Sequence, residues 1–308
     1  MINRILIRIR VIQIVYAWYQ NRDKDLNQVE RELLLGLQKS YDLYYYLLQL
    51  MIEITDLHEE RVNTKKNKFL PTHEDLNPNM HIINNQFISQ LRNNSMFVSY
   101  IANRPMSWEL NQNFARGILD KIIESDTYKE YAELAKPTYN DDKEFWRKSF
   151  RTFIHRNEEL DDILEDESIF WNDDIEIVQS FVLKTIKQFN KTAGEGFILL
   201  PMFNDDEDRD YATTLLRETL ANGQKYREMI AKNADNWDFE RIAFMDVVIM
   251  QVAVAELYKF ENIPIRVTLN EYIDLAKSYS TPKSSTFING VLDAIVTEMK
   301  KDKTIFKN

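Results

Sequence analysis

The sequence contains no cysteine among its 308 residues. A chain without thiols has no disulfide scaffold, no zinc–thiolate or iron–sulfur site and no cysteine nucleophile. Glycine and proline are also scarce, with 6 and 7 residues. Few turns are therefore forced, and hairpin signals between strand-like segments are nearly absent. The composition favours an all-α chain in a reducing compartment, and we expect that compartment to be the cytoplasm.

Long uncharged apolar runs are missing as well. The first stretch, MINRILIRIRVIQIVYAWYQ, interleaves arginines with apolar side chains. A signal peptide instead has a charged start followed by an uninterrupted apolar run. No window reaches the roughly 18 uncharged apolar residues of a membrane-spanning helix. We therefore expect neither a leader nor a membrane segment.

The common signatures of enzymes are absent. The four histidines, His58, His73, His81 and His155, show no H-x-x-x-H spacing, so we predict no metal site. The GEG segment at 194–196 is too short for a dinucleotide or phosphate loop, and no G-x-S-x-G elbow occurs. We predict no catalytic residues and no cofactor, and we expect that the chain is not an enzyme.

The charges are unevenly distributed along the chain. The net charge of −10 argues by itself against binding nucleic acid. Residues 1–22, however, contain four arginines and no acid, whereas residues 157–176 contain ten acids and no base. A basic patch can therefore exist on this acidic protein.

Helical spacing dominates the apolar pattern. Apolar residues recur every three or four positions through 26–48, which predicts one long helix. The adjacent tyrosines 44–46 lie on it, and we predict that they pack in the core rather than form a platform for RNA bases. The polar segment 62–85 is predicted to be a loop, and 193–210 a connector.

The first segment is ambiguous between strand and helix. Ile7 to Val11 alternate as in a strand, but the pattern continues to Trp18 without a breaker. We therefore predict a helix. In that helix Arg4 and Arg8 share a face, and Arg10 points elsewhere.

The C-terminal third carries the strongest helical signals. The segment 238–260 is apolar on nearly every side between Phe244 and Leu257, which predicts a helix buried centrally in a bundle. Thr268 and Glu271 form a T-x-x-E capping box for the next helix. Gly290 lies inside the last helix at a cost of about 1 kcal/mol relative to alanine, so we expect another backbone to approach it closely. We predict that the lysine-containing tail after Val296 is frayed.

A series of short motifs in residues 236–295 resembles one known family. In order, the motifs are Trp237 and Arg241, Asp246, Ala253, Glu256-Leu257, Ile263-Pro264, Asn270-Glu271, Leu275-Ala276-Lys277, and the run from Phe287 to Asp293. Their order and spacing resemble the C-terminal half of the NusB family of bacterial transcription antitermination factors. Arg8, Gln13 and Tyr16 also resemble the first helix of that family. The resemblance spans residues 1–50 and 208–297.

The resemblance implies an all-α fold, namely a NusB-like helical bundle with an additional helical insertion. Family members are typically much shorter than this chain. We therefore predict that residues 1–55 and 206–308 form the RNA-binding bundle and that residues 56–205 form the insertion. The resemblance leaves the role of that insertion open.

The same resemblance implies RNA binding. The family binds boxA-type RNA in rRNA leader transcripts together with NusE, a small-subunit ribosomal protein, and joins an antitermination complex on RNA polymerase. By position, the RNA-binding residues implied here are Arg4, Arg8, Arg10, Tyr16, Asp246, Lys277 and Phe287. Arginines contact phosphates, aromatic side chains stack on unpaired bases, and a carboxylate accepts a hydrogen bond from a base amino group.

Other interpretations stay open. Taken alone, arginines at a helix start favour a solvated face, and Phe287 and Tyr16 favour core positions. Lys277 would then serve its helix end, and Asp246 would bond within the bundle. At the level of the whole protein, one alternative is the RNA-binding module of an rRNA methyltransferase, which needs a catalytic domain that we do not expect after Val296. Another is a protein-only helical scaffold that docks through the acidic insertion.

Overall fold

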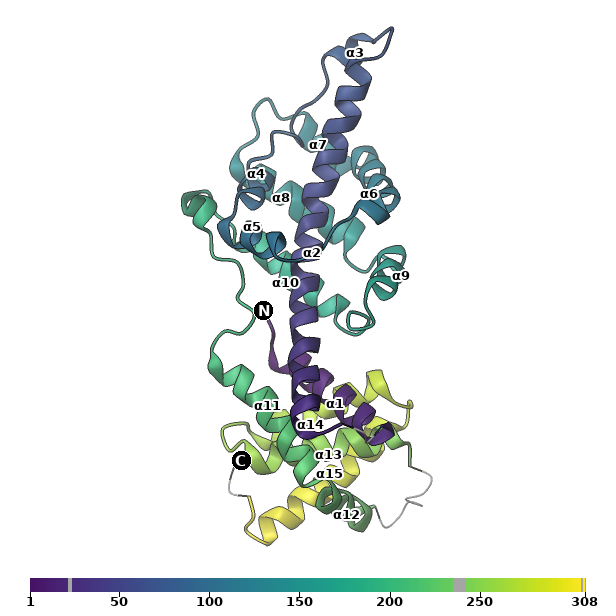
Figure 1. Cartoon of the computed structure of the whole chain (residues 1–308), viewed down its shortest axis with the longest axis vertical. Coiled ribbons are helices and arrows are strands. Elements are labelled where there is room, and N and C mark those ends of the chain that lie inside the picture. Colours follow the sequence, from purple (N-terminus) through teal and green to yellow (C-terminus); the bar gives the residue numbers. More distant parts are fainter. Residues whose placement is uncertain (22–23, 235–241, 306, 308) are drawn as a thin grey trace. The chain divides into compact units, whose positions relative to one another are not determined.

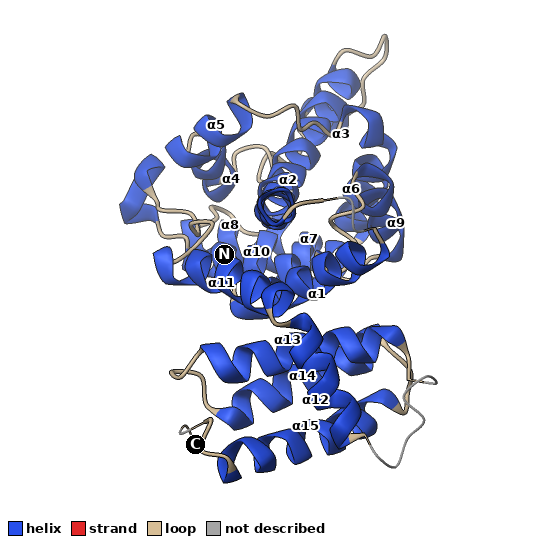
Figure 2. Cartoon of the chain, turned by 60° about the horizontal axis from the view of Figure 1, so that its bottom comes forward, coloured by secondary structure: helices blue, strands red, loops and turns tan. Residues whose placement is uncertain are grey.

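The computed structural model describes residues 1–21, 24–234, 242–305 and 307. Every regular element in these ranges is a helix, which confirms the predicted all-α class (Figure 2). Within the same ranges, no helix is both long and apolar enough to cross a membrane. The motif residues Trp237 and Arg241 lie outside the described residues.

The helices follow one another along the chain as labelled in Figure 1. They are α1 (Arg4–Gln20), α2 (Leu26–Lys66), α3 (His73–Leu76), α4 (Gln86–Arg92), α5 (Ser95–Ala102), η1 (Glu109–Asn111), α6 (Gln112–Glu124), α7 (Asp126–Ala132), α8 (Tyr139–Ser149), η2 (Phe150–Ile154), α9 (Glu158–Glu167), α10 (Ile175–Gln188), η3 (Lys191–Gly196), α11 (Asp206–Ala221), α12 (Gly223–Asn233), α13 (Phe244–Lys259), α14 (Ile265–Tyr279) and α15 (Ser284–Lys301).

The chain divides into two compact units. Residues 2–37 and 203–308 form the first, called here the bundle unit, and residues 38–202 together with Met1 form the second, called here the insertion unit. Helix α2 contributes its first turns to the bundle unit and the rest of its length to the insertion unit. The assignment of RNA binding to 1–55 and 206–308 stays a prediction.

The bundle unit is built around α13. Helices α1, α11, α12, α14 and α15 all pack against it, and its residues from Asp246 to Leu257 are buried. A helix that is apolar on all sides has no face suited to solvent, so it lies at the centre of the bundle. The prediction of a central helix in this segment is confirmed.

The insertion unit is built around the long part of α2. Its tyrosines Tyr44, Tyr45 and Tyr46 are at most 2% exposed, which confirms that they belong to the core. The Tyr44 hydroxyl lies 2.7 Å from Thr185 Oγ1, and the Tyr46 ring stacks on Trp108 with centroids 4.2 Å apart. Buried hydroxyls need such partners, because an unpaired one costs desolvation free energy.

Helix α2 continues to Lys66, past the predicted start of the loop at residue 62. Val62 is only 5% exposed, so packing holds the chain helical through a segment of polar composition. Lys65 and Lys66 then occupy the last turn, where cations are stabilised by the helix dipole.

Candidate nucleic-acid interface

The antiparallel packing of α1 on α13 decides which predicted site residues lie together. Arg8 near the start of α1 bonds Glu256 near the end of α13, whereas Tyr16 packs on Phe244, the first residue of α13. At 1.5 Å per residue, Arg4 and Tyr16 are about 18 Å apart along α1. The predicted arginines and the predicted aromatic residue therefore lie towards opposite ends of the bundle unit.

Arg8 is the centre of a buried ion pair. Its guanidinium is 3% exposed and donates to both Glu256 oxygens, at 2.8 Å to Oε2 and 3.0 Å to Oε1. A third bond of 3.1 Å reaches Glu271. The Glu256 carboxylate also accepts hydrogen bonds from the hydroxyl groups of three further side chains, Tyr211, Tyr272 and Thr268.

The local electrostatics keep this pair ionised. Burial by itself would raise the pKa of the Glu256 carboxyl, but the hydrogen bonds and the charge of Arg8 outweigh it and hold that pKa below its usual value. Burial opposes the charge of Arg8 in the same way, yet its bonds to Glu256 raise the pKa of the guanidinium above its ordinary value. Burial also raises the pKa of the Tyr211 and Tyr272 phenols, so both remain donors.

The predicted capping box at Thr268 and Glu271 is wrong. Helix α14 begins earlier, at Ile265 after Pro264, so Thr268 lies within its first turns. The Thr268 hydroxyl donates to Glu256 Oε1 at 2.8 Å, and Glu271 accepts from Arg8. Both side chains are therefore committed to the buried ion pair and not to a helix end.

The other two predicted arginines also have partners within the bundle unit. Arg10 is 4% exposed and donates from Nη1 to Gln13 at 2.8 Å. Its aliphatic stem lies against Gly36, where an added Cβ would come within 2.7 Å of Arg10 Cδ. Arg4 is half-buried, pairs with Asp208 at 3.6 Å and lies over the Tyr211 ring. Of the three, Arg4 alone presents much of its side chain to solvent.

A half-buried aromatic cluster surrounds Tyr16. Its ring lies 5.4 Å from that of Phe244, and the Tyr19 ring meets Phe244 edge-on at 5.8 Å. The guanidinium of Arg227 on α12 lies 5.5 Å from the Tyr19 ring centroid and 5.9 Å from that of Phe244. An arginine beside partly exposed rings offers both stacking surface and positive charge. Sequence reasoning missed Arg227, because only the packing of α12 brings it to this cluster.

Asp246 lies two residues after Phe244 in the first turn of α13. It is 4% exposed, and its Oδ2 accepts a 2.8 Å hydrogen bond from the Ser284 hydroxyl at the start of α15. Among the described residues, none donates a hydrogen bond to the other oxygen, Oδ1. A buried carboxylate oxygen without a donor is costly, so this atom is an acceptor in need of a partner.

Phe287 and Lys277 lie on the two helices that border Asp246. The Ser284 hydroxyl oxygen also lies 3.1 Å from the Ser280 hydroxyl oxygen, which links the start of α15 to the end of α14. Phe287 follows one turn into α15 and is 7% exposed, whereas Lys277 is exposed in the last turn of α14 and pairs with Asp274 at 2.6 Å. The structure thus joins the Asp246, Lys277 and Phe287 segments at this end of the bundle unit.

Two expectations about the C-terminal segment are wrong. Gly290 is exposed on α15, and apart from its own stretch of helix no described residue has an atom within 4 Å of the position its Cβ would take, so no backbone from another described element approaches it. The tail is anchored rather than frayed, because Lys307 donates to the Phe260 carbonyl at 2.7 Å and thereby caps the end of α13. Burial lowers the pKa of the Lys307 amine.

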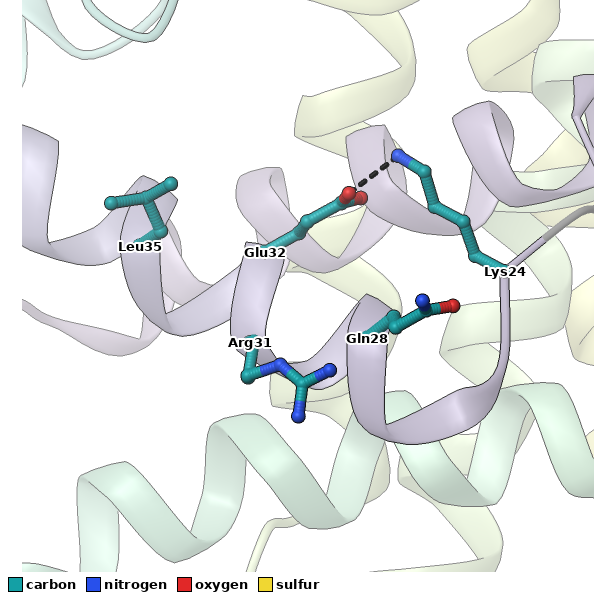
Figure 3. Close-up of a pocket in the computed structure, with 5 residues that line it drawn as sticks. All are labelled: Lys24, Gln28, Arg31, Glu32 and Leu35. Carbon is teal, nitrogen blue, oxygen red and sulfur yellow. Dashed lines mark hydrogen bonds and ion pairs between the residues drawn. The ribbon is translucent and has the colours of Figure 1, made fainter.

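A shallow hollow of about 260 Å³ lies at the first turns of α2 (Figure 3). Its lining is Lys24, Gln28, Arg31, Glu32 and Leu35. Lys24 and Glu32 form an ion pair across it, so two of its charged groups neutralise each other. We assign no ligand to this hollow.

Comparison with known proteins gives a consistent result. A family model described as the NusB family matches residues 176–297. Transcription antitermination protein NusB of Salinibacter ruber is 41% identical over 124 residues, which cover 38% of this chain and 78% of that protein. The protein of the same name from Chloroherpeton thalassium is 37% identical over 37% of this chain and 54% of its own length. That from Listeria welshimeri is 41% identical over 31% of this chain and 75% of its own length. No solved structure matches the chain.

Proposed function

This chain belongs to the NusB family, and from that premise we propose that its bundle unit binds boxA-type RNA of rRNA leader transcripts. It acts together with a NusE-like small-subunit ribosomal protein in an antitermination complex on RNA polymerase. The RNA lies across the end of the bundle unit where α13 begins.

The observation that carries this proposal is the half-buried aromatic cluster of Tyr16 and Phe244 at that end. Asp246 beside it is 4% exposed, so it supports the site from within as the acceptor that holds Ser284 at the start of α15. The aromatic cluster of Tyr16 and Phe244, with Arg227 beside it, supplies the stacking surface that unpaired bases require. Lys277 and Phe287 belong to the segments that border this acceptor.

The three N-terminal arginines have different roles in this proposal. Arg4 lies towards the opposite end of the bundle unit, where it pairs with Asp208, so it does not contact the RNA at the end where α13 begins. Arg8 and Arg10 support the site by fixing α1, because their guanidinium groups are buried and bonded within the chain. Few accessible cations remain for the RNA, so its affinity for this protein alone is modest, and the ribosomal protein adds the missing contacts.

Fluorescence anisotropy with a boxA-type RNA tests the proposal. The titration is run over a salt series, with and without the ribosomal protein, for the wild type, Asp246→Asn and Tyr16→Ala. We expect the partner to tighten binding and each substitution to weaken it, with about 1–3 kcal/mol lost when a stacking side chain is removed. An exposed lysine of the insertion unit, Lys121→Ala, is the control. Equal binding of boxA and scrambled RNA would contradict the proposal and would leave a protein-only scaffold as the better explanation.

A further inference from the structure

The insertion unit is acidic as a whole, yet six of its basic side chains gather on two adjacent helices and the short helical turns that follow them. Residues 38–202 contain 19 lysines and arginines against 27 acids. The six basic side chains form a surface on α8, η2, α10 and η3, called here the basic ridge. Its members are Lys143, Arg147, Arg151, Lys184, Lys187 and Lys191.

Antiparallel packing brings the two halves of the basic ridge side by side. Helix α8 packs on α10, and the two labels lie next to each other in Figure 2. Lys143 Nζ donates to the Phe189 carbonyl at 3.2 Å, and Gln179 Oε1 accepts from the backbone N–H of Arg156 at 3.0 Å. The start of α8 therefore faces the end of α10. Lys143, Arg147 and Arg151 follow at intervals of four, so they share one face of their helix.

The segments that carry the basic ridge contain few acids. Glu144 is the sole acid between residues 143 and 157, and no acid occurs between residues 177 and 194. Helix α4, which also packs on α8, has none either. Lys148 is excluded from the basic ridge, because it lines a separate hollow together with the acids Glu130, Asp141 and Glu144.

Three of the six cations make no ion pair with any described residue. The side chains of Arg151, Lys184 and Lys187 are exposed, so their charges are solvated. Arg147 pairs with Glu144 at 2.7 Å, Lys143 holds the end of α10, and Lys191 donates to Gln86. Arg151 lies in a π-helical turn, closed by the bond from His155 N–H to the Phe150 carbonyl at 2.8 Å. Such turns occur frequently at functional sites.

We propose that the basic ridge binds the phosphate backbone of RNA, as a second contact surface separate from the one on the bundle unit. Three exposed cations without an ion pair to any described residue favour a polyanion, and phosphate contacts supply affinity without reading sequence. All six members are lysines or arginines, so the basic ridge holds RNA by charge.

Anisotropy titrations with two RNAs test this inference on the full chain. One RNA is a boxA-type element followed by 20 further nucleotides, and the other is a 20-nucleotide oligouridine without that element. The variant Arg151→Ala/Lys184→Ala/Lys187→Ala removes the three unpaired cations. The control Lys65→Ala/Lys121→Ala/Lys136→Ala removes the same charge from exposed lysines elsewhere in the insertion unit.

We expect the ridge variant to lose about tenfold in affinity for both RNAs, and the slope of log K against log salt to fall by about 2, as for three lost contacts to a single strand. The control variant should bind like the wild type. Equal affinities and slopes for the ridge variant and the control would overturn the inference, and so would a wild type that fails to bind oligouridine at low salt. The oligouridine result does not depend on boxA recognition, so failure of the proposed function remains distinguishable.

Discussion

A single side chain, Arg8, shows how burial separates a structural arginine from a binding one. Its guanidinium is enclosed by Glu256, Glu271 and two tyrosine rings, and it is 3% exposed. The sequence alone could place Arg8 on an arginine-bearing helix, and the family resemblance suggested RNA. The sequence could not show that Glu256, 248 positions later, would accept from Nε and Nη2 of Arg8 while Glu271 accepts from Nη1.

Substitution of Arg8 tests this structural role. We expect Arg8→Ala to lower the free energy of unfolding by about 3–5 kcal/mol, because it leaves the buried Glu256 carboxylate uncompensated. Arg4→Ala is the matched control and should cost less than about 1 kcal/mol, since its pair with Asp208 is partly exposed. Urea denaturation followed by circular dichroism measures both changes. Similar losses for the two variants would contradict the buried-pair interpretation.

Glycine at position 290 gives a second prediction at the scale of one residue. Apart from its own stretch of helix, no described residue has an atom within 4 Å of the added methyl group, and the position is helical, so Gly290→Ala should raise the free energy of unfolding by about 1 kcal/mol. The measurement is again urea denaturation. A loss of stability would mean that something in the folded chain approaches this position after all.

At the scale of the element, helix positions follow from apolar spacing, but helix ends depend on tertiary partners. The long helix α2 and the central helix α13 could be predicted because their apolar periodicity is strong. The start of α14 could not, since Thr268 has the composition of a cap and yet bonds Glu256. The predicted end of α2 at residue 62 is wrong for a similar reason, because Val62 packs in the core within a segment of polar composition.

Helix α2 also carries a buried histidine that should make stability depend on pH. Burial, with the nearby charges of Arg61 and Lys65, lowers the pKa of His58 to about 4. His58 therefore takes up a proton near pH 6.5 in the unfolded chain, but only near pH 4 in the folded chain. The contribution of the neutral His58 to the free energy of unfolding is fully present above about pH 6.5. It decreases as the pH falls towards 4, by roughly 2 kcal/mol at pH 5.

Urea denaturation at pH 7 and pH 5, followed by tryptophan fluorescence, checks the His58 prediction. Three of the five tryptophans, Trp108, Trp146 and Trp171, lie in the insertion unit. The variant His58→Phe should lose less stability than the wild type between the two pH values. An equal loss in both proteins would assign the pH dependence to other groups.

At the scale of the whole molecule, the chain combines a family-typical bundle unit with an insertion unit of which the family model covers only residues 176–202. The resemblance identified the family, and the all-α class followed from the scarcity of glycine and proline. The grouping of Tyr16 with Phe244 and Arg227, and the basic ridge on α8 and α10, could not be predicted. Each depends on helices that are distant in sequence and adjacent only after packing.

The most direct test of the central claim is hydrogen–deuterium exchange of the full chain with and without a boxA-type RNA. The proposed site predicts slower exchange with RNA in residues 13–20 at the end of α1 and in residues 277–290, with little change at residues 206–216 at the start of α11. Protection confined to other parts of the bundle unit, or no protection at a saturating RNA concentration, would contradict the assignment of RNA binding to the end of the bundle unit where α13 begins.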